Sequence, residues 1–425
     1  MATIKIAVIG LGYVGLPLAC LFSSKYETIG FDQNSDRIRE LGNLYDNTLE
    51  TSDKKLKEAF DKGFVCTDQL KWIKKCNFYI IAVPTPVDIN NHPDLTPIIE
   101  ASKTVGKVIS KGDIVVYEST VYPGVTEDEC VPVIEKTSGL KFNVDFFAGY
   151  SPERINPGDK KHTVENIIKI TSGSTPEIAD VIDETYRSVL KNGTHRAPNI
   201  KVAEAAKIIE NTQRDVNIAL MNELARIMNA MDIDTNDVIE AASTKWNFIK
   251  MKPGLVGGHC ISVDPYYLIQ KAQVYGILPR IMTDARRLND SMGNYVAGQV
   301  IRIMNKKGVM VKNARILLLG FTFKENCPDI RNTKILDIYS SLSEYTKNIT
   351  IIDPCCDRKK VWEQYHILIE NEDLNKYNHQ FDAVILCVAH DEFHNLHVRD
   401  LLSNNNGVVY DVKGILDRNQ IDGRL

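Results

Sequence analysis

Short apolar runs alternate with longer polar segments through the first part of the chain. The runs are rich in β-branched and aromatic residues, which is typical of buried strands: Ile4–Ile9, Glu27–Phe31, Phe78–Val83, Ile114–Glu118 and Phe146–Ala148. The polar segments between them carry apolar residues at helical spacing. Strands that alternate with helices predict a parallel sheet that is covered on both faces.

The pattern changes near Pro198. From about Val202 to Met231 the chain has no Gly and no Pro, and apolar residues recur every three or four positions. This spacing predicts one helix of roughly 30 residues. We expect further helix to about Ala242 and again from about Ile281 to Asn305. The segment MKPGLVGGHCISVDP between them, residues 251–265, is rich in Gly and Pro and is expected to be a loop.

The alternation of strands and helices resumes at Ala314. The next strand candidates are Arg315–Gly320, Ile349–Asp353, Ala383–Val388 and Val408–Asp411. The predicted fold class is therefore α/β, with two Rossmann-like parallel-sheet domains joined by a central α-helical domain that contains a long helix. We place the domains at residues 1–197, 198–308 and 309–425.

Composition and charge narrow the functional classes. The 425 residues are 44% hydrophobic and 25% charged, values that exclude a wholly disordered chain. A net charge of −4 without a basic tract argues against nucleic acid as a partner and against a polybasic membrane anchor. The uncharged stretch from Ile6 to Ser24 is interrupted by three Gly and one Pro, so we expect no membrane insertion.

The nine cysteines are scattered and include no C-x-x-C pair. This usage fits a reducing cytoplasm better than a disulfide framework. We therefore predict a cytoplasmic protein with no metal site.

The first predicted strand, turn and helix contain a dinucleotide-binding signature. Gly10, Gly12 and Gly15 have the G-x-G-x-x-G spacing, and Asp32 ends the next strand about 20 residues later. The helix N-terminus would offer free N–H groups to a pyrophosphate. Asp32 would accept from a ribose 2′-hydroxyl and repel a 2′-phosphate, which favours NAD over NADP. The nearby Arg37 weakens that preference a little.

Two further groups of residues could take part in catalysis or binding. Lys207, Asn211 and Arg214 share one face of the long predicted helix, where a solvated polar stripe is the commoner interpretation. Cys260 follows two glycines and precedes Asp264 by four residues. A single cysteine is more often an inert buried residue. In this loop, and at a helix start, it could instead be a nucleophile with a nearby acid as base.

Seven motifs together give the chain a family resemblance over essentially its whole length. They are GLGYVGLP at 10–17, VPTP at 83–86, ESTVYPG at 118–124, SPERINPGD at 151–159, EAAKIIENTQRDVNIAL at 204–220, GLVGGHCISVDPYYL at 254–268 and GFTFKENCPDIRNT at 320–333. The sequence resembles the nucleotide-sugar 6-dehydrogenases, the family of UDP-glucose and GDP-mannose dehydrogenases. It looks closest to the branch that acts on UDP-N-acetylhexosamines in surface polysaccharide synthesis.

The resemblance implies a role for individual residues. The implied catalytic residues are Cys260 as nucleophile, with Lys207, Asn211, Asp264, Glu153 and Thr120. The implied NAD-binding residues are Gly10, Gly12, Tyr13, Val14, Gly15, Asp32, Arg37, Thr85, Thr120 and Arg331. The implied nucleotide-sugar-binding residues are Arg154, Ile155, Lys207, Asn211, Arg214, Gly257, Phe323 and Lys324. The long helix matches the element that forms the family's homodimer, and higher homo-oligomers stay open.

The implied reaction oxidises the sugar C6 alcohol to a carboxylate with two NAD, through a thiohemiacetal and a thioester on Cys260. UDP-glucose members typically carry a glutamate four residues after Glu153, where this chain has Pro157. That difference disfavours UDP-glucose and leaves the base for hydrolysis open between Glu153 and Asp264. We favour UDP-N-acetylglucosamine as substrate, with the galacto and manno epimers as alternatives.

Two other interpretations are much less favoured. A two-electron hydroxyacid dehydrogenase also has a dinucleotide domain and a catalytic lysine, but it needs no nucleophilic cysteine. A nucleotide-sugar-binding or NAD-sensing protein without activity should have lost some of the catalytic residues, and all are present.

Overall fold

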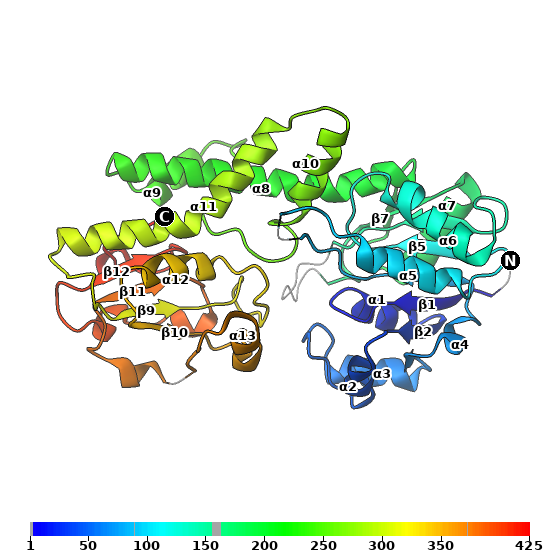
Figure 1. Cartoon of the computed structure of the whole chain (residues 1–425), viewed down its shortest axis with the longest axis horizontal. Coiled ribbons are helices and arrows are strands. Elements are labelled where there is room, and N and C mark those ends of the chain that lie inside the picture. The colour runs from blue at the N-terminus through cyan, green and yellow to red at the C-terminus, as the bar shows by residue number, and fades with distance from the viewer. Residues whose placement is uncertain (1–2, 89, 155–162, 372) are drawn as a thin grey trace. The chain divides into compact units, whose positions relative to one another are not determined.

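A computed structural model of the chain describes residues 3–88, 90–154, 163–371 and 373–425. The chain divides into two compact units. One unit comprises residues 1–210 with 266–271, and the other comprises 211–265 with 272–425. Figure 1 shows that each unit is built on its own β-sheet.

The first unit contains an eight-stranded sheet in the order β3-β2-β1-β4-β5-β6-β7-β8. Neighbouring strands are parallel except β6 and β7, which are antiparallel. The strands are β1 (Lys5–Ile9), β2 (Glu27–Phe31), β3 (Val65–Thr67), β4 (Phe78–Ile81), β5 (Ile114–Tyr117), β6 (Phe147–Tyr150), β7 (Lys169–Gly173) and β8 (Thr194–Arg196).

Helices cover both faces of this sheet, which explains why its central strands β4 and β5 are apolar at every position, as β1 is after Lys5. In β1, Ala7 and Ile9 pack into one core, whereas Ile6 and Val8 pack into another. The first core also takes residues from α5 (Thr96–Gly106) and α6 (Val131–Ser138). The second takes residues from α1 (Gly15–Phe22), α3 (Asp53–Asp61) and α7 (Pro176–Arg187). Shorter elements are α2 (Ser35–Gly42), α4 (Leu70–Ile73) and the π-helix η1 (Val125–Cys130).

The division between the units falls inside two helices. The long helix α8 (Ile200–Ala230) contributes its first three turns or so, residues 200–210, to the first unit and the rest to the second. Helix α10 (Asp264–Val274) follows the Gly/Pro-rich loop, and its residues 266–271 belong to the first unit while its two ends belong to the second. Helices α9 (Thr235–Ala242) and α11 (Arg280–Lys306) belong to the second unit.

The second unit contains a five-stranded parallel sheet in the order β10-β9-β11-β12-β13. Residues of α11, α12 and α13 pack on one face, and short 3₁₀ segments pack on the other. The strands are β9 (Ile316–Leu319), β10 (Ile349–Ile352), β11 (Ala383–Leu386), β12 (Val408–Asp411) and β13 (Gly423–Arg424). The remaining helices are α12 (Ile335–Ser343), α13 (Arg358–Tyr365), η2 (Leu374–Tyr377), η3 (Asp391–Phe393), η4 (Val398–Leu401) and η5 (Arg418–Gln420).

The predicted α/β fold class is confirmed, and so is the long helix. The division into three domains stays a prediction. Four strands were missed, namely β3, β7, β8 and β13, each short or not dominated by apolar residues. The predicted parallel sheet is observed, except that β7, a strand that was not predicted, pairs antiparallel with β6. A parallel pair needs a crossover, and no described residue between these two strands is helical.

Within the described part of the chain, no helix is both long enough and apolar enough to cross a membrane. The uncharged stretch from Ile6 to Ser24 forms most of β1, the glycine turn and helix α1 instead.

Candidate active site

The glycine turn after β1 has the geometry of a dinucleotide site. Gly10 adopts a φ of +91°, and a Cβ there would lie 2.8 Å from the Ala82 carbonyl oxygen. A Cβ on Gly15 would lie 1.8 Å from the Gly10 oxygen, so these two positions admit only glycine. Around Gly12, by contrast, a Cβ would meet no described atom within 4 Å. The backbone at Gly12, followed by Tyr13, Val14 and the start of α1, is therefore open to a phosphate group.

Asp32 follows directly after β2 and points back at this turn. Its Oδ2 accepts a hydrogen bond from the Leu11 N–H at 2.9 Å, and its Oδ1 accepts one from the Asn34 N–H at 2.9 Å. The residue is half-buried. Each carboxylate oxygen has a second lone pair, so Asp32 can still accept from a ribose hydroxyl.

Arg37 stabilises the glycine turn through hydrogen bonds. Its Nε donates to the Leu11 carbonyl oxygen at 3.0 Å, and its Nη2 donates to Asp46 Oδ1 at 2.6 Å. The side chain is buried, and Nη1 also donates to Asn47. A guanidinium engaged in this way is poorly placed to bind a 2′-phosphate, so its presence does not weaken the preference for NAD.

Thr85 and Thr120 lie at the ends of adjacent strands, after β4 and β5. The Thr85 hydroxyl donates to the Thr120 carbonyl oxygen at 2.7 Å, and Ser119 donates to the Val83 carbonyl oxygen at 2.6 Å. These bonds tie the two segments together at the carboxyl edge of the sheet, where α/β proteins bind ligands.

Glu153 and Lys207 come together in the first unit. The Lys207 Nζ lies 3.8 Å from Glu153 Oε2, and the two residues are only 4% and 8% exposed. The Glu153 N–H donates to the Glu118 carbonyl oxygen. The burial of Lys207 excludes the solvated polar stripe that its sequence spacing allowed.

A buried ion pair supports the segment that carries Glu153. Lys169 Nζ donates to Glu118 Oε2 at 2.5 Å and to the Pro152 carbonyl oxygen at 3.1 Å. The Tyr186 hydroxyl donates to the other Glu118 oxygen at 2.6 Å. Burial raises the pKa of Glu118, and Lys169 opposes that rise. The ion pair thus fixes the peptide unit that joins Pro152 to Glu153.

Asn211 and Asp264 form a second pair, in the other unit. The Asn211 Nδ2 donates to Asp264 Oδ2 at 2.5 Å, and both residues are buried. Asp264 is the first residue of α10, where a carboxylate is favoured by the helix dipole. Asn211 lies one turn after Lys207 on α8.

Cys260 lies in a turn that precedes α10. The N–H groups of Val263 and Asp264 donate to its carbonyl oxygen at 3.1 and 2.8 Å. The residue is half-buried, and its thiol forms no disulfide. It stands four residues before α10 begins, so the expected position at the helix start was wrong.

The loop before Cys260 packs closely on residues 321–334. A Cβ on Gly257 would lie 2.6 Å from the Asn332 carbonyl oxygen, and one on Gly258 would lie 2.7 Å from the Phe323 ring. Asn332 Nδ2 also donates to the Gly258 carbonyl oxygen at 3.0 Å. Gly257 and Phe323 of the predicted substrate site are therefore neighbours, and Lys324 follows Phe323 directly.

The predicted arginines differ in their surroundings. Arg331 makes a bidentate pair with Asp329, with its Nε 3.0 Å from Oδ1. Arg154 pairs with Glu210 at 2.8 Å and donates to the Ile168 carbonyl oxygen. Arg214 is exposed on α8. Ile155 and Pro157 lie outside the described residues.

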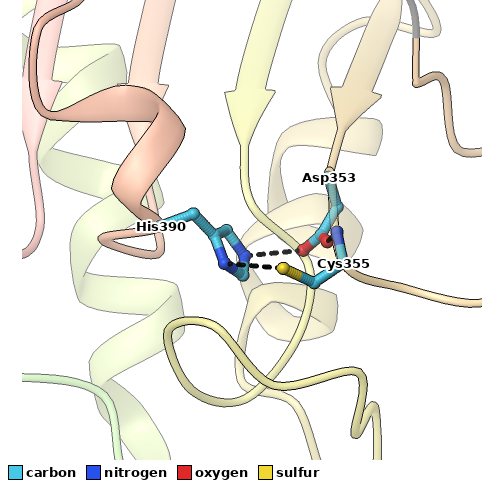
Figure 2. A group of neighbouring side chains, drawn as sticks. All are labelled: Asp353, Cys355 and His390. Atoms are coloured by element: carbon cyan, nitrogen blue, oxygen red, sulfur yellow. Dashed lines mark hydrogen bonds and ion pairs between the residues drawn. The ribbon is translucent and has the colours of Figure 1, made fainter.

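One cluster has the composition of a metal site. Asp353, Cys355 and His390 bring a carboxylate, a thiol and an imidazole within 4.8 Å of one another (Figure 2). His390 Nε2 lies 3.1 Å from Asp353 Oδ2, and Cys355 Sγ lies 3.4 Å from His390 Nδ1. Carboxylate, thiolate and imidazole are all common ligands of zinc.

The hydrogen bonds of the cluster argue against a metal. The Asn326 N–H donates to His390 Nδ1 at 3.0 Å, so that nitrogen carries no proton and Nε2 donates to Asp353. Asp353 Oδ2 also accepts from the N–H groups of Phe321 and Thr322. A metal would have to displace several of these bonds, so we assign no metal to the cluster.

The glycine turn, the acid after β2 and the helical layers on both faces of a mostly parallel sheet define a dinucleotide-binding domain of the Rossmann class. Comparison with known proteins gives the family. The NAD binding domain of the UDP-glucose/GDP-mannose dehydrogenase family matches residues 4–190, its central domain matches 201–291, and its UDP binding domain matches 317–418. The chain belongs to this family.

Individual relatives match over the whole chain. The UDP-N-acetyl-D-glucosamine 6-dehydrogenase of Pseudomonas aeruginosa is 54% identical over 428 residues, covering 100% of both chains. The enzyme of the same name from Salmonella typhi is 55% identical and covers 99% of both chains. Among solved structures, a UDP-D-ManNAc dehydrogenase from Pyrococcus horikoshii has a TM-score of 0.90 at 30% identity, covering 99% of this chain and 98% of that one.

Proposed function

We propose that the protein is a UDP-N-acetyl-D-glucosamine 6-dehydrogenase. The observation that carries this proposal is the 54–55% identity, along the full chain, with two enzymes of that name. The galacto and manno epimers of the substrate are the alternatives, since they differ from it at one sugar carbon. The product would be a UDP-N-acetylhexosaminuronic acid for capsule or O-antigen synthesis.

The first unit has the features that NAD requires. The open backbone at Gly12 would face the pyrophosphate, and Asp32 would accept from the ribose. Thr85 and Thr120 of this unit, and Arg331 of the second unit, complete the proposed NAD-binding set. When bound, each of two NAD molecules supplies the acceptor for one hydride from the sugar C6.

Cys260 would make a single site sufficient for both oxidations. After the first oxidation its thiol adds to the C6 aldehyde, forming a C–S bond and an alcohol, the thiohemiacetal. Loss of the second hydride and of the alcohol proton gives a thioester. Water then cleaves the C–S bond, so the carboxylate leaves and the thiol is restored. The reactive aldehyde is never released.

The buried pairs suit the remaining steps. Lys207 and Asn211 would stabilise the oxyanion of the thiohemiacetal with a cation and an amide N–H. Glu153, 3.8 Å from Lys207, and Asp264, bonded to Asn211, are the two acids that could activate the hydrolytic water. Arg154, Arg214, Gly257, Phe323 and Lys324 would bind the UDP-sugar.

We also infer a homodimer in the cytoplasm. The apolar side chains of Val202, Ile209, Leu220 and Ile227 are all at least 43% exposed. At about 100° per residue they fall within roughly 20° of one another around α8, on one side of the helix. Light scattering should therefore give the mass of two chains. The nine cysteines form no disulfide, which is consistent with a reducing compartment.

The decisive experiment counts the NADH formed per sugar. Reactions are run to completion with UDP-N-acetylglucosamine, its galacto and manno epimers, and UDP-glucose. We expect two NADH per sugar and the highest rate with the gluco form. Cys260→Ala should stop after at most one oxidation, whereas Cys66→Ala, which alters another half-buried thiol, should behave as wild type.

Other outcomes would overturn parts of the proposal. One NADH per sugar from the wild type would exclude the thioester and indicate a two-electron dehydrogenase. A higher rate with an epimer would reassign the substrate and leave the mechanism intact.

A further inference from the structure

A buried polar network joins α8 to α11 in the second unit. Asp215 and Asn222 lie two turns apart on α8, and Arg286 and Asn289 lie one turn apart on α11. All four residues are at most 1% exposed. Burying so many polar groups is costly unless each is well bonded, so the network needs an explanation.

The hydrogen bonds of the network form a series that leads from the charged pair, Arg286 and Asp215, to Asn222. Arg286 Nη1 donates to Asp215 Oδ1 at 2.5 Å, and Asn289 Nδ2 donates to the same oxygen at 2.7 Å. Asn289 Oδ1 then accepts from Asn222 Nδ2 at 2.8 Å. The charged pair therefore fixes the amide of Asn289, which in turn fixes the amide of Asn222.

Asn222 is the last residue of this series, and its side chain binds the loop that carries Cys260. Its Oδ1 accepts from the Gly254 N–H at 2.8 Å, and its Nδ2 donates to the Gly254 carbonyl oxygen at 3.0 Å. The side chain thus pairs with a backbone unit as a neighbouring strand would. Both amide hydrogens and the oxygen of Asn222 are used, a combination that Asp cannot supply.

The same network reaches the other end of the loop. Arg286 Nη2 donates to Asp290 at 2.6 Å, and Asp290 pairs with Lys334 at 3.0 Å. Lys334 is the N-cap of α12 and stands two residues after Asn332, which donates to the Gly258 carbonyl oxygen. The segment from Gly254 to Gly258 is therefore held at both ends, just before Cys260.

We propose that Asn222 and Asn289 are positioning residues that set the placement of Cys260 through Gly254 and contact no substrate. This inference rests on the proposed role of Cys260. Sequence spacing did not single these residues out, because two asparagines on buried faces of separate helices carry no local pattern.

The test measures two properties of purified full-length variants. Asn222→Ala should lower kcat 10- to 100-fold while the KM values for NAD and the UDP-sugar change less than threefold. The rate at which iodoacetamide alkylates Cys260, followed by peptide mass spectrometry, should change at least threefold. Asn289→Ala removes the anchor of Asn222 and the bonds from Asn289 to Asp215 but leaves the contact of Asn222 with Gly254. It should show the same changes in smaller degree and serves if Asn222→Ala does not fold.

Asn229→Ala is the matched control. This asparagine lies on the same helix, one heptad after Asn222, and donates to Tyr295 at 3.2 Å rather than to the loop. Its kcat and Cys260 alkylation should equal those of the wild type. Unchanged kcat and alkylation in both Asn222→Ala and Asn289→Ala would overturn the inference, even if their melting temperatures fall. If Cys260→Ala instead keeps full activity, the proposed function fails, while the alkylation rates still report the loop position.

Discussion

The two sheets of the molecule carry an acid at the same point of their folds and use it differently. Asp32 and Asp353 each follow the second strand of their sheet along the chain, β2 and β10. Each accepts from the N–H of a residue that follows a positive-φ glycine, Leu11 at 2.9 Å and Phe321 at 2.6 Å. Those glycines, Gly10 and Gly320, have φ values of +91° and +96°.

The difference lies in what else surrounds each carboxylate. Asp32 is half-buried and keeps lone pairs for a ribose. Asp353 has no exposed surface, and it receives hydrogen bonds from His390 and four backbone N–H groups. Position in a fold therefore places an acid near a ligand site, but the neighbouring side chains decide whether it binds a ligand or stabilises the protein.

The largest effect should come from Asp353→Ala. It leaves His390 and the backbone N–H groups buried without their acceptor, which typically costs about 3–5 kcal/mol. We expect the amides of β9 and β10 to lose that much protection in native-state hydrogen exchange. Cys355→Ser is the control within the cluster, because it removes only a weak S–H donor. An equal loss in both variants would refute the distinction between the two acids.

A smaller effect should follow from pH, and it should appear in the first unit but not in the second. Burial raises the pKa of Glu204 in the first unit to about 7, although its bonds from Gly124 and Thr126 oppose the rise. An acid with a raised folded-state pKa binds more protons folded than unfolded, so stability falls as pH rises. Between pH 5.5 and 8 this loss is about 2 kcal/mol.

Asp353 behaves in the opposite way. Burial alone would raise its pKa, but His390 and the N–H groups of Phe321 and Thr322 outweigh burial and lower the pKa. Its contribution is present above the unfolded pKa of about 4 and is lost only below it. Hydrogen exchange should therefore show β1 weakening from pH 5.5 to 8 while β9 stays constant. Glu204→Gln should remove the change in β1, and a persisting change would assign it to another group.

The smallest of these effects is expected for Asp32→Asn. The variant keeps one oxygen for the ribose but loses the charge, so the KM for NAD should rise about tenfold, equivalent to about 1.4 kcal/mol. Stability and the KM for the UDP-sugar should hardly change. Asp36→Asn, an exposed acid on the following helix, is the kinetic control. A large loss of stability in Asp32→Asn would show that both acids serve the fold.

Sequence periodicity was sufficient for the main elements because each central strand is buried on both faces and α8 has no breaker. It failed at β7 and β8, whose residues are polar and whose pairing depends on distant strands. The glycine turn and Asp32 were recognisable from local spacing. The Glu153–Lys207 and Asn211–Asp264 pairs were not, since each joins residues about 50 apart along the chain. Their grouping came from the resemblance alone.

Inherited substitutions at the three glycines of the turn should also fall into two classes. Any side chain at Gly10 or Gly15 collides with the protein's own backbone, so such alleles should lower the amount of enzyme in the cell. A side chain at Gly12 meets no described atom and should leave that amount intact while reducing the turnover of each molecule. Abundance and specific activity, measured together, would therefore separate neighbouring substitutions that a sequence alignment treats alike.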